Sequence, residues 1–182
     1  MNKKILILSF ALLFLLAVNL HLGCRVCIGG EWDSALYTLS EARRGERAAF
    51  ESAEEICRHN ARLPKLKEKL IFSFRPPEGE SRRLSALILE RVPGVSPLYR
   101  VESEGRRLGV VADRERLEER LRAALYTAMP ETAARASFAS AVEITPVYSR
   151  SGSEMSVSDM AMVVSSAVPA IFTDREGIRI QG

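Results

Sequence analysis

The first strong pattern in the sequence is an uncharged, largely aliphatic run from Ile5 to Leu20, which follows Lys3 and Lys4. A cationic stretch followed by an apolar one is typical of a signal peptide or a signal anchor. A helix over this run rises only about 24 Å, so spanning a hydrocarbon core of about 30 Å requires the helix to continue to Ile28. We therefore predict a membrane segment over residues 1–28, with a cleaved signal as the open alternative. Because the lysines precede the run, the N-terminus is expected in the cytoplasm and the remainder outside it.

The polar segment from Asp33 to Asn60 carries a loose stripe of apolar positions and is predicted to be helical, with Gly45 as a candidate break. Residues 69–75 then alternate between apolar and polar positions before two prolines, which predicts a strand with one apolar face. Residues 82–92 return to helical spacing, and Pro93-Gly94 closes that short helix.

The second half of the chain begins with a β-hairpin pattern over residues 98–111, with Glu104-Gly105 in its turn. Asp113 is positioned to cap a helix that carries leucines at helical spacing and ends before Pro130. The pattern then predicts a strand over 138–148, a short helix over 157–168 and two short strands around a Glu-Gly turn.

The two halves follow the same order: helix, strand, polar loop, short apolar helix ending in Val-Pro, and a hairpin with Glu-Gly in its turn. The Val92-Pro93 and Val168-Pro169 pairs lie 76 residues apart. We therefore predict an α+β fold in which an N-terminal membrane helix precedes a tandem duplication of a small αβαββ unit. The predicted parts are residues 1–28 (membrane segment), 29–62 (juxtamembrane helical segment), 63–112 (first α+β unit) and 113–182 (second α+β unit).

Charge excludes one class of partner. The chain has 26 basic and 23 acidic residues, and Lys3, Lys4 and Arg25 account for the whole excess. The remaining body is therefore neutral, and only 7% of the chain is aromatic. Nucleic-acid binding requires a basic surface, so we expect no nucleic-acid partner.

The three cysteines do not define a disulfide framework or a metal site. Cys24 and Cys27 have C-x-x-C spacing, but they lie against the predicted membrane segment rather than at the start of a helix after a strand, so a redox role is not expected. Leu22-Gly23-Cys24 resembles the end of a bacterial lipobox, which makes Cys24 a candidate for lipidation. The chain has only two histidines, and we predict neither a metal site nor a cofactor.

No catalytic constellation is predicted either. Cys57 and His59 lie two positions apart on the expected helix, where side chains point about 200° away from each other and cannot form a hydrogen-bonded dyad. The loop around Ser151 and Ser153 lacks the strand–Gly-x-Ser-x-Gly–helix context, and no histidine follows it. The sequence thus gives no catalytic residue, and we expect the chain not to be an enzyme.

The hairpin-to-helix run from Leu98 to Asp113 and the helix after it resemble a segment of membrane-anchored Gram-positive cell-wall proteins. In that family the segment precedes a lysostaphin-type zinc endopeptidase domain. The resemblance covers the leader and about residues 66–182, and it depends mostly on glycines and aliphatic residues. The His-x-x-x-Asp and His-x-His motifs of the family's zinc site are absent from this chain, so no catalytic residue is carried over.

This resemblance implies a membrane-tethered, extracytoplasmic and non-catalytic module of the bacterial cell envelope. Its expected partners are the membrane and either peptidoglycan or an envelope protein, and its expected localisation is single-pass in the cell membrane. The alternative is the non-catalytic N-terminal part of a peptidoglycan hydrolase whose catalytic domain is missing from this chain. A reading frame that continued past Gly182 into a histidine-bearing domain would support the alternative.

Overall fold

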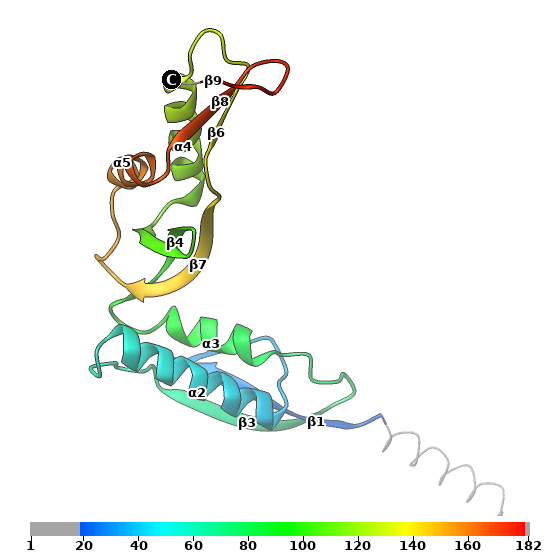
Figure 1. Cartoon of the computed structure of the whole chain (residues 1–182). Coiled ribbons are helices and arrows are strands. Elements are labelled where there is room, and N and C mark those ends of the chain that lie inside the picture. Colours follow the sequence, from blue (N-terminus) through cyan, green and yellow to red (C-terminus); the bar gives the residue numbers. More distant parts are fainter. Residues whose placement is uncertain (1–18, 181–182) are drawn as a thin grey trace, which may run out of the picture. The chain divides into compact units, whose positions relative to one another are not determined.

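The structure, a computed structural model, describes residues 19–180, which form an α+β fold with four helices and three small sheets in that range (Figure 1). The helices are α2 (Leu39–Ile56), α3 (Ser81–Leu89), α4 (Arg114–Ala128) and α5 (Val157–Ala167). The chain divides into two compact units, the first ending at Val95 and the second starting at Ser96.

The first unit is built on the strand β1 (His21–Ile28), which is the middle strand of its sheet. It pairs antiparallel along its whole length with β3 (Leu66–Ser73), and the two-residue strand β2 (Glu31–Trp32) lies on its other side. Val26 and Ile28 point to the face that helices α2 and α3 cover, and both are buried. The apolar alternation of β1 therefore contributes directly to the core of this unit.

Helices α2 and α3 pack against each other closely because α2 presents small residues to α3. The Thr38 side chain caps α2 by accepting a hydrogen bond of 3.1 Å from the Glu41 N–H. Gly45 lies in the helix interior, where an added Cβ would stand 2.7 Å from the Ser81 carbonyl oxygen. The candidate break at Gly45 is thus absent, because the glycine is used for close helix packing. The buried positions of α2 are Ala42, Gly45, Ala49 and Ala53.

The second unit contains two three-stranded sheets. In the first, β4 (Val95–Ser103) lies between β5 (Arg106–Val111) and β7 (Val142–Arg150), and β4 and β5 form the predicted hairpin. In the second, β8 (Ala170–Thr173) lies between β6 (Arg135–Phe138) and β9 (Arg179–Ile180). The core of the unit consists of Val101, Val111, Leu117, Leu121, Met160, Ala161 and Val164.

The predicted membrane helix over residues 1–28 is wrong where the structure describes it. His21–Ile28 is strand β1, whose backbone pairs with β3 and whose alternate side chains enter a core. Between residues 19 and 180 no helix has the length and apolar character needed to cross a membrane. Residues 5–18 of the predicted segment lie outside the described residues. The single-pass membrane localisation depended on that helix and is corrected with it.

A second correction concerns the single strand predicted over residues 138–148. The structure has two strands there, β6 and β7, which belong to different sheets and are separated by a bend at Ala139 and Ser140. The predicted boundary between the two α+β units at residue 112 stays a prediction, and the compact units divide after Val95. The tandem duplication itself stays a prediction, and the β4–β5 hairpin lies with β7 in the second unit.

Candidate functional site

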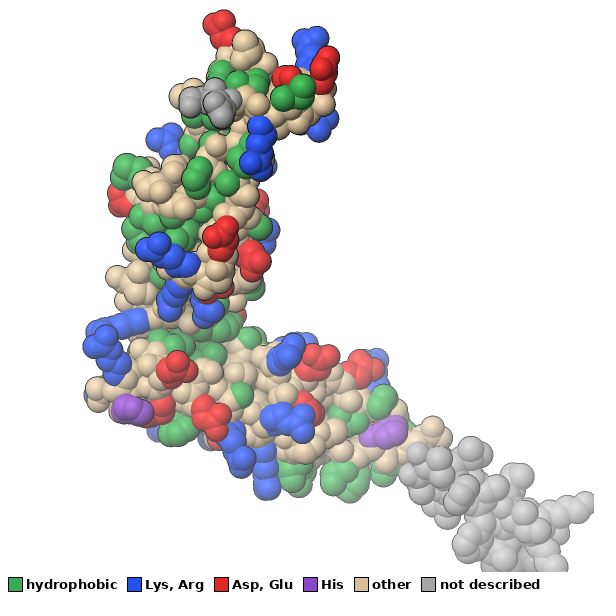
Figure 2. All heavy atoms as spheres, viewed as in Figure 1, with side chains coloured by type: hydrophobic (Ala, Val, Ile, Leu, Met, Phe, Trp, Pro, Cys, Tyr) green, Lys and Arg blue, Asp and Glu red, His purple; other side chains and the backbone are tan. Residues whose placement is uncertain are grey.

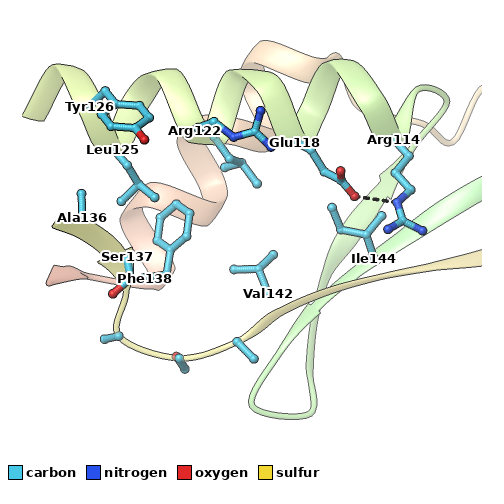
Figure 3. A pocket seen from close by; sticks show the side chains of 14 residues that line it. Arg114, Glu118, Arg122, Leu125, Tyr126, Ala136, Ser137, Phe138, Val142 and Ile144 are labelled. Atoms are coloured by element: carbon cyan, nitrogen blue, oxygen red, sulfur yellow. Dashed lines mark hydrogen bonds and ion pairs between the residues drawn. The ribbon is translucent and has the colours of Figure 1, made fainter.

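The second unit has a groove of about 680 Å³ between α4 and the segment that connects β6 to β7 (Figure 3). This volume is within the usual range for sites that bind small molecules or peptide segments. One wall comes from α4 and the other from residues 136–142 together with Ile144. The α4 wall consists of Arg114, Glu118, Leu121, Arg122, Leu125 and Tyr126.

Helix geometry explains the α4 wall. Asp113 caps the helix, and its Oδ1 accepts a hydrogen bond of 3.0 Å from the Arg116 N–H, as the sequence predicted. Wall residues recur at intervals of three, four or one along α4, which places them along one side of the helix. Leu117 and Leu121 turn into the core and fix the rotation of the helix. The groove wall is therefore held by the packed core behind it.

The opposite wall is anchored by long-range hydrogen bonds. The Ala139 N–H donates to the Pro169 carbonyl at 2.8 Å, and the Ser103 hydroxyl donates to the Ala141 carbonyl at 3.0 Å. Phe138 and Val142, on either side of this bend, pack against the core cluster. This wall therefore has an apolar surface from Phe138 and Val142, and hydrogen bonds at Ala139 and Ala141 fix the backbone between them.

The rim of the groove is charged. Arg114 Nε donates to Glu118 Oε1 at 2.6 Å, and this hydrogen bond raises the pKa of Arg114 above its usual value. Arg122 is exposed and forms no ion pair or side-chain hydrogen bond with another described residue. Tyr126 is 63% exposed beside it. One guanidinium of the rim is thus neutralised within the protein, and the other is available to a ligand.

This arrangement suits an extended ligand that carries a carboxylate. A guanidinium binds a carboxylate with paired N–H donors, a tyrosine adds an apolar ring with a hydroxyl, and the apolar surface of Phe138 and Val142 accepts apolar groups. All five lysines of the chain lie before residue 70, so every basic side chain of the second unit is arginine. Within residues 19–180, no group of three or more histidine, cysteine, aspartate or glutamate residues is placed to hold a metal ion.

Cys24, the candidate lipidation site, is fully buried in β1. Burial raises the pKa of its thiol, and the nearby Glu68 carboxylate raises it further. Cys27 also lies in β1, but an odd spacing along a strand places the two side chains on opposite faces, so the C-x-x-C pair does not form a disulfide here. Lipidation at Cys24 stays a prediction, and a lipid on this thiol would have to leave the packed sheet.

The other residues considered in the sequence do not form a site. Cys57 is the residue that ends α2, and His59 follows in a turn with its Nδ1 3.3 Å from Glu54 Oε2. The Ser153 hydroxyl donates to the Arg150 carbonyl at 2.6 Å, and Ser156 caps α5. These serines are loop and cap residues, as the sequence indicated.

Sequence reasoning missed Arg122 and Tyr126, because alternating charges on α4 are typical of a solvated helix face. The groove forms because β6 and β7 join different sheets beside α4. No residue pattern near the bend between these strands predicts that separation. Comparison of this chain with protein-family models, curated proteins and solved structures found no match. The family resemblance therefore remains an expectation.

Proposed function

We propose that this chain is a non-catalytic binding module whose groove between α4 and the β6–β7 segment accepts an extended, carboxylate-bearing peptide. The observation that carries the proposal is Arg122, whose exposed guanidinium lies at the rim of an apolar groove and pairs with no other residue between 19 and 180. The stem peptide of peptidoglycan has this chemistry, with short apolar side chains and free carboxylates. The resemblance to cell-wall proteins makes it the ligand class to test first.

The charge pattern supports a specific contact over general ionic attraction. The Arg114–Glu118 pair occupies one end of the α4 wall and cancels its own charge. A carboxylate entering the groove would therefore be oriented towards Arg122, with its apolar portion over Leu125 and Phe138. Binding of this kind should survive moderate salt, since the apolar contacts do not depend on ionic strength.

The test is cosedimentation of the full chain with purified insoluble peptidoglycan at several salt concentrations, together with calorimetric titration of a soluble stem tetrapeptide. We expect Arg122→Gln to weaken tetrapeptide binding about tenfold or more, because a hydrogen bond to a charged group contributes about 1.5–3 kcal/mol. Amidation of the peptide carboxylates should weaken binding to the unchanged protein by a similar factor.

The matched control is Arg120→Gln, since Arg120 lies on the same helix but does not line this groove. It should leave the affinity within about twofold of the starting value. Absence of saturable pelleting, or an equal loss in both variants, would contradict the proposal. Equal loss would mean that the arginines act only through general positive charge.

A further inference from the structure

The first unit carries an exposed apolar patch on its sheet, formed by Leu22, Leu70, Phe72 and Phe74 and here named the β3 patch. These side chains are between 55% and 70% exposed. Apolar side chains are visible on the surface of this unit in Figure 2. In the register of the sheet, Leu22 lies opposite Phe72, so both point to the same face. Single exposed apolar residues are ordinary, whereas a cluster of large ones indicates an interaction surface.

Leu70 and Phe72 of the patch lie on a strand with a free edge. In the described part of the chain the order of this sheet is β2-β1-β3, so β1 pairs with one edge of β3 and no strand pairs with the other. Lys67, Glu68 and Lys69 protect the first half of β3 with exposed charges. The second half, from Leu70 to Ser73, and the Phe74 that follows it have no charge. An uncharged apolar edge readily pairs with another strand, so the expected partner is itself a β-strand.

A second copy of β3 provides a partner of matching chemistry. A two-fold axis perpendicular to the joined sheet places the same face of both copies on the same side. Side chains alternate between the two faces along a strand, so directly opposed residues of two antiparallel β3 strands must both have even numbers or both have odd numbers. Opposing Lys69 with its own copy would bring like charges together. Opposing Leu70 with its own copy would place Glu68 against Phe72. Both registers are unfavourable.

Opposing Ile71 with its own copy moves such conflicts to the ends of the pairing. Leu70 then faces Phe72 of the other copy, and Lys69 faces Ser73, so the central pairs are compatible. Glu68 and Lys67 come opposite Phe74 and Arg75, which lie beyond the end of β3 at Ser73. The pairing would join two three-stranded sheets into one six-stranded sheet. It would also use up both free β3 edges, which limits the assembly to two copies.

We propose that the chain forms a two-fold symmetric dimer through antiparallel pairing of β3 with β3 of a second copy, centred on Ile71 and bringing Leu70 and Phe72 of the two copies into contact. The apolar half of β3 drives this association, and the charged half fixes its register. The dimer does not depend on the groove of the second unit, so it can be tested separately from ligand binding.

The first test is the mass of the full chain in solution by sedimentation equilibrium. We expect about twice the 20.2 kDa of one chain at tens of micromolar protein. Phe72→Ser should shift the protein to the single-chain mass. Because Phe72 is 70% exposed, this change should leave the circular dichroism spectrum unchanged. The matched control is Phe50→Ser on α2, which alters another exposed phenylalanine outside the patch and should leave the dimer intact.

The second test fixes the register by cross-linking. In a Cys57→Ser background, Ile71→Cys places two thiols directly across the two-fold axis, where Cα atoms lie about 4.5–5.5 Å apart and a disulfide fits. Diamide accepts the two electrons and two protons released as the disulfide forms. The control Lys67→Cys places its thiols eight residues apart along the strand pair, about 26 Å, and should not link.

Three results would overturn the proposal. One is a single-chain mass at all concentrations, and another is a dimer that persists in Phe72→Ser. The third is cross-linking of Lys67→Cys without cross-linking of Ile71→Cys. Binding of the single chain to phospholipid vesicles through Phe72, with no dimer present, would assign the patch to a lipid surface and would also overturn it.

Discussion

Asp33 connects several parts of the first unit through its two carboxylate oxygens and its backbone carbonyl. The hydroxyl of the fully buried Tyr37 donates to one oxygen, and Arg83 Nη2 lies 3.1 Å from the other. The guanidinium of Arg25 donates to the carbonyl at 3.1 and 3.3 Å, and it also lies 6.0 Å from the ring centre of Trp32. Burial and the adjacent carboxylate raise the pKa of Tyr37 above its usual value near 10.

This shift predicts a loss of stability in alkali. The Tyr37 hydroxyl stays protonated in the folded chain at pH values where the unfolded chain ionises it, so its contribution is full below about pH 10 and is lost as pH rises further. Urea unfolding between pH 7 and 11 should show a falling free energy of unfolding above pH 10. Tyr37→Phe should be less stable by about 1–3 kcal/mol at pH 7 but should have a flatter alkaline dependence.

The matched control is Tyr126→Phe, since Tyr126 is 63% exposed in the other unit. It should reproduce both the neutral stability and the alkaline slope of the unchanged protein. An alkaline slope that is the same in Tyr37→Phe would show that other groups cause the loss.

At the scale of elements, the packing of α2 on α3 depends on the missing side chain of Gly45. In an exposed helix, Gly→Ala stabilises by about 1 kcal/mol. Here the added Cβ would stand 2.7 Å from the Ser81 carbonyl and 3.0 Å from the Leu84 Cβ, and a backbone atom cannot yield as a side chain does. We expect Gly45→Ala to destabilise by about 1–3 kcal/mol in thermal or urea unfolding. The exposed Arg47→Ala should change stability little, and stabilisation by Gly45→Ala would contradict close packing.

Elements with a local signal could be predicted from the sequence. The β4–β5 hairpin follows from Glu104-Gly105, where both residues have positive φ, and the start of α4 follows from the Asp113 cap. The start of α5 follows from its helical spacing. Each of these features is decided by residues within one or two turns of chain.

Elements decided by distant partners could not be predicted. Residues 21–28 follow directly on an apolar run, so the sequence alone favours the continuation of a membrane helix through them. Only their pairing with β3, which follows about 40 residues later, makes them strand β1. The division of β6 from β7 likewise depends on the pairing of β6 with β8, more than 30 residues away. The groove also depends on this long-range strand pairing, so the sequence did not indicate Arg122 and Tyr126 as groove residues.

At the scale of the whole chain, each compact unit has its own buried residues, and this predicts where a core substitution acts. Leu117 is fully buried in the core cluster of the second unit. Leu117→Ala should cost about 2–5 kcal/mol and should reduce hydrogen-exchange protection in α4, α5 and the β4–β5 hairpin.

The counterpart is Leu84→Ala in the first unit, where Leu84 of α3 is 1% exposed and packs against Gly45 of α2. It should reduce protection in β1 and β3 by a similar amount. If both variants lowered protection equally throughout the chain, the two units would unfold as one cooperative structure.

The place of β1 in its sheet also affects the order of events during synthesis. Its long partner β3 follows only after α2, since Ile28 pairs with Leu66 and His21 with Ser73. At about 5–20 residues per second, β1 leaves the ribosome roughly 2–10 seconds before β3 does. The β4–β5 hairpin needs no such delay, because its strands adjoin. During those seconds the apolar face of β1 is uncovered, and a chaperone that binds short apolar segments would find its site in this strand.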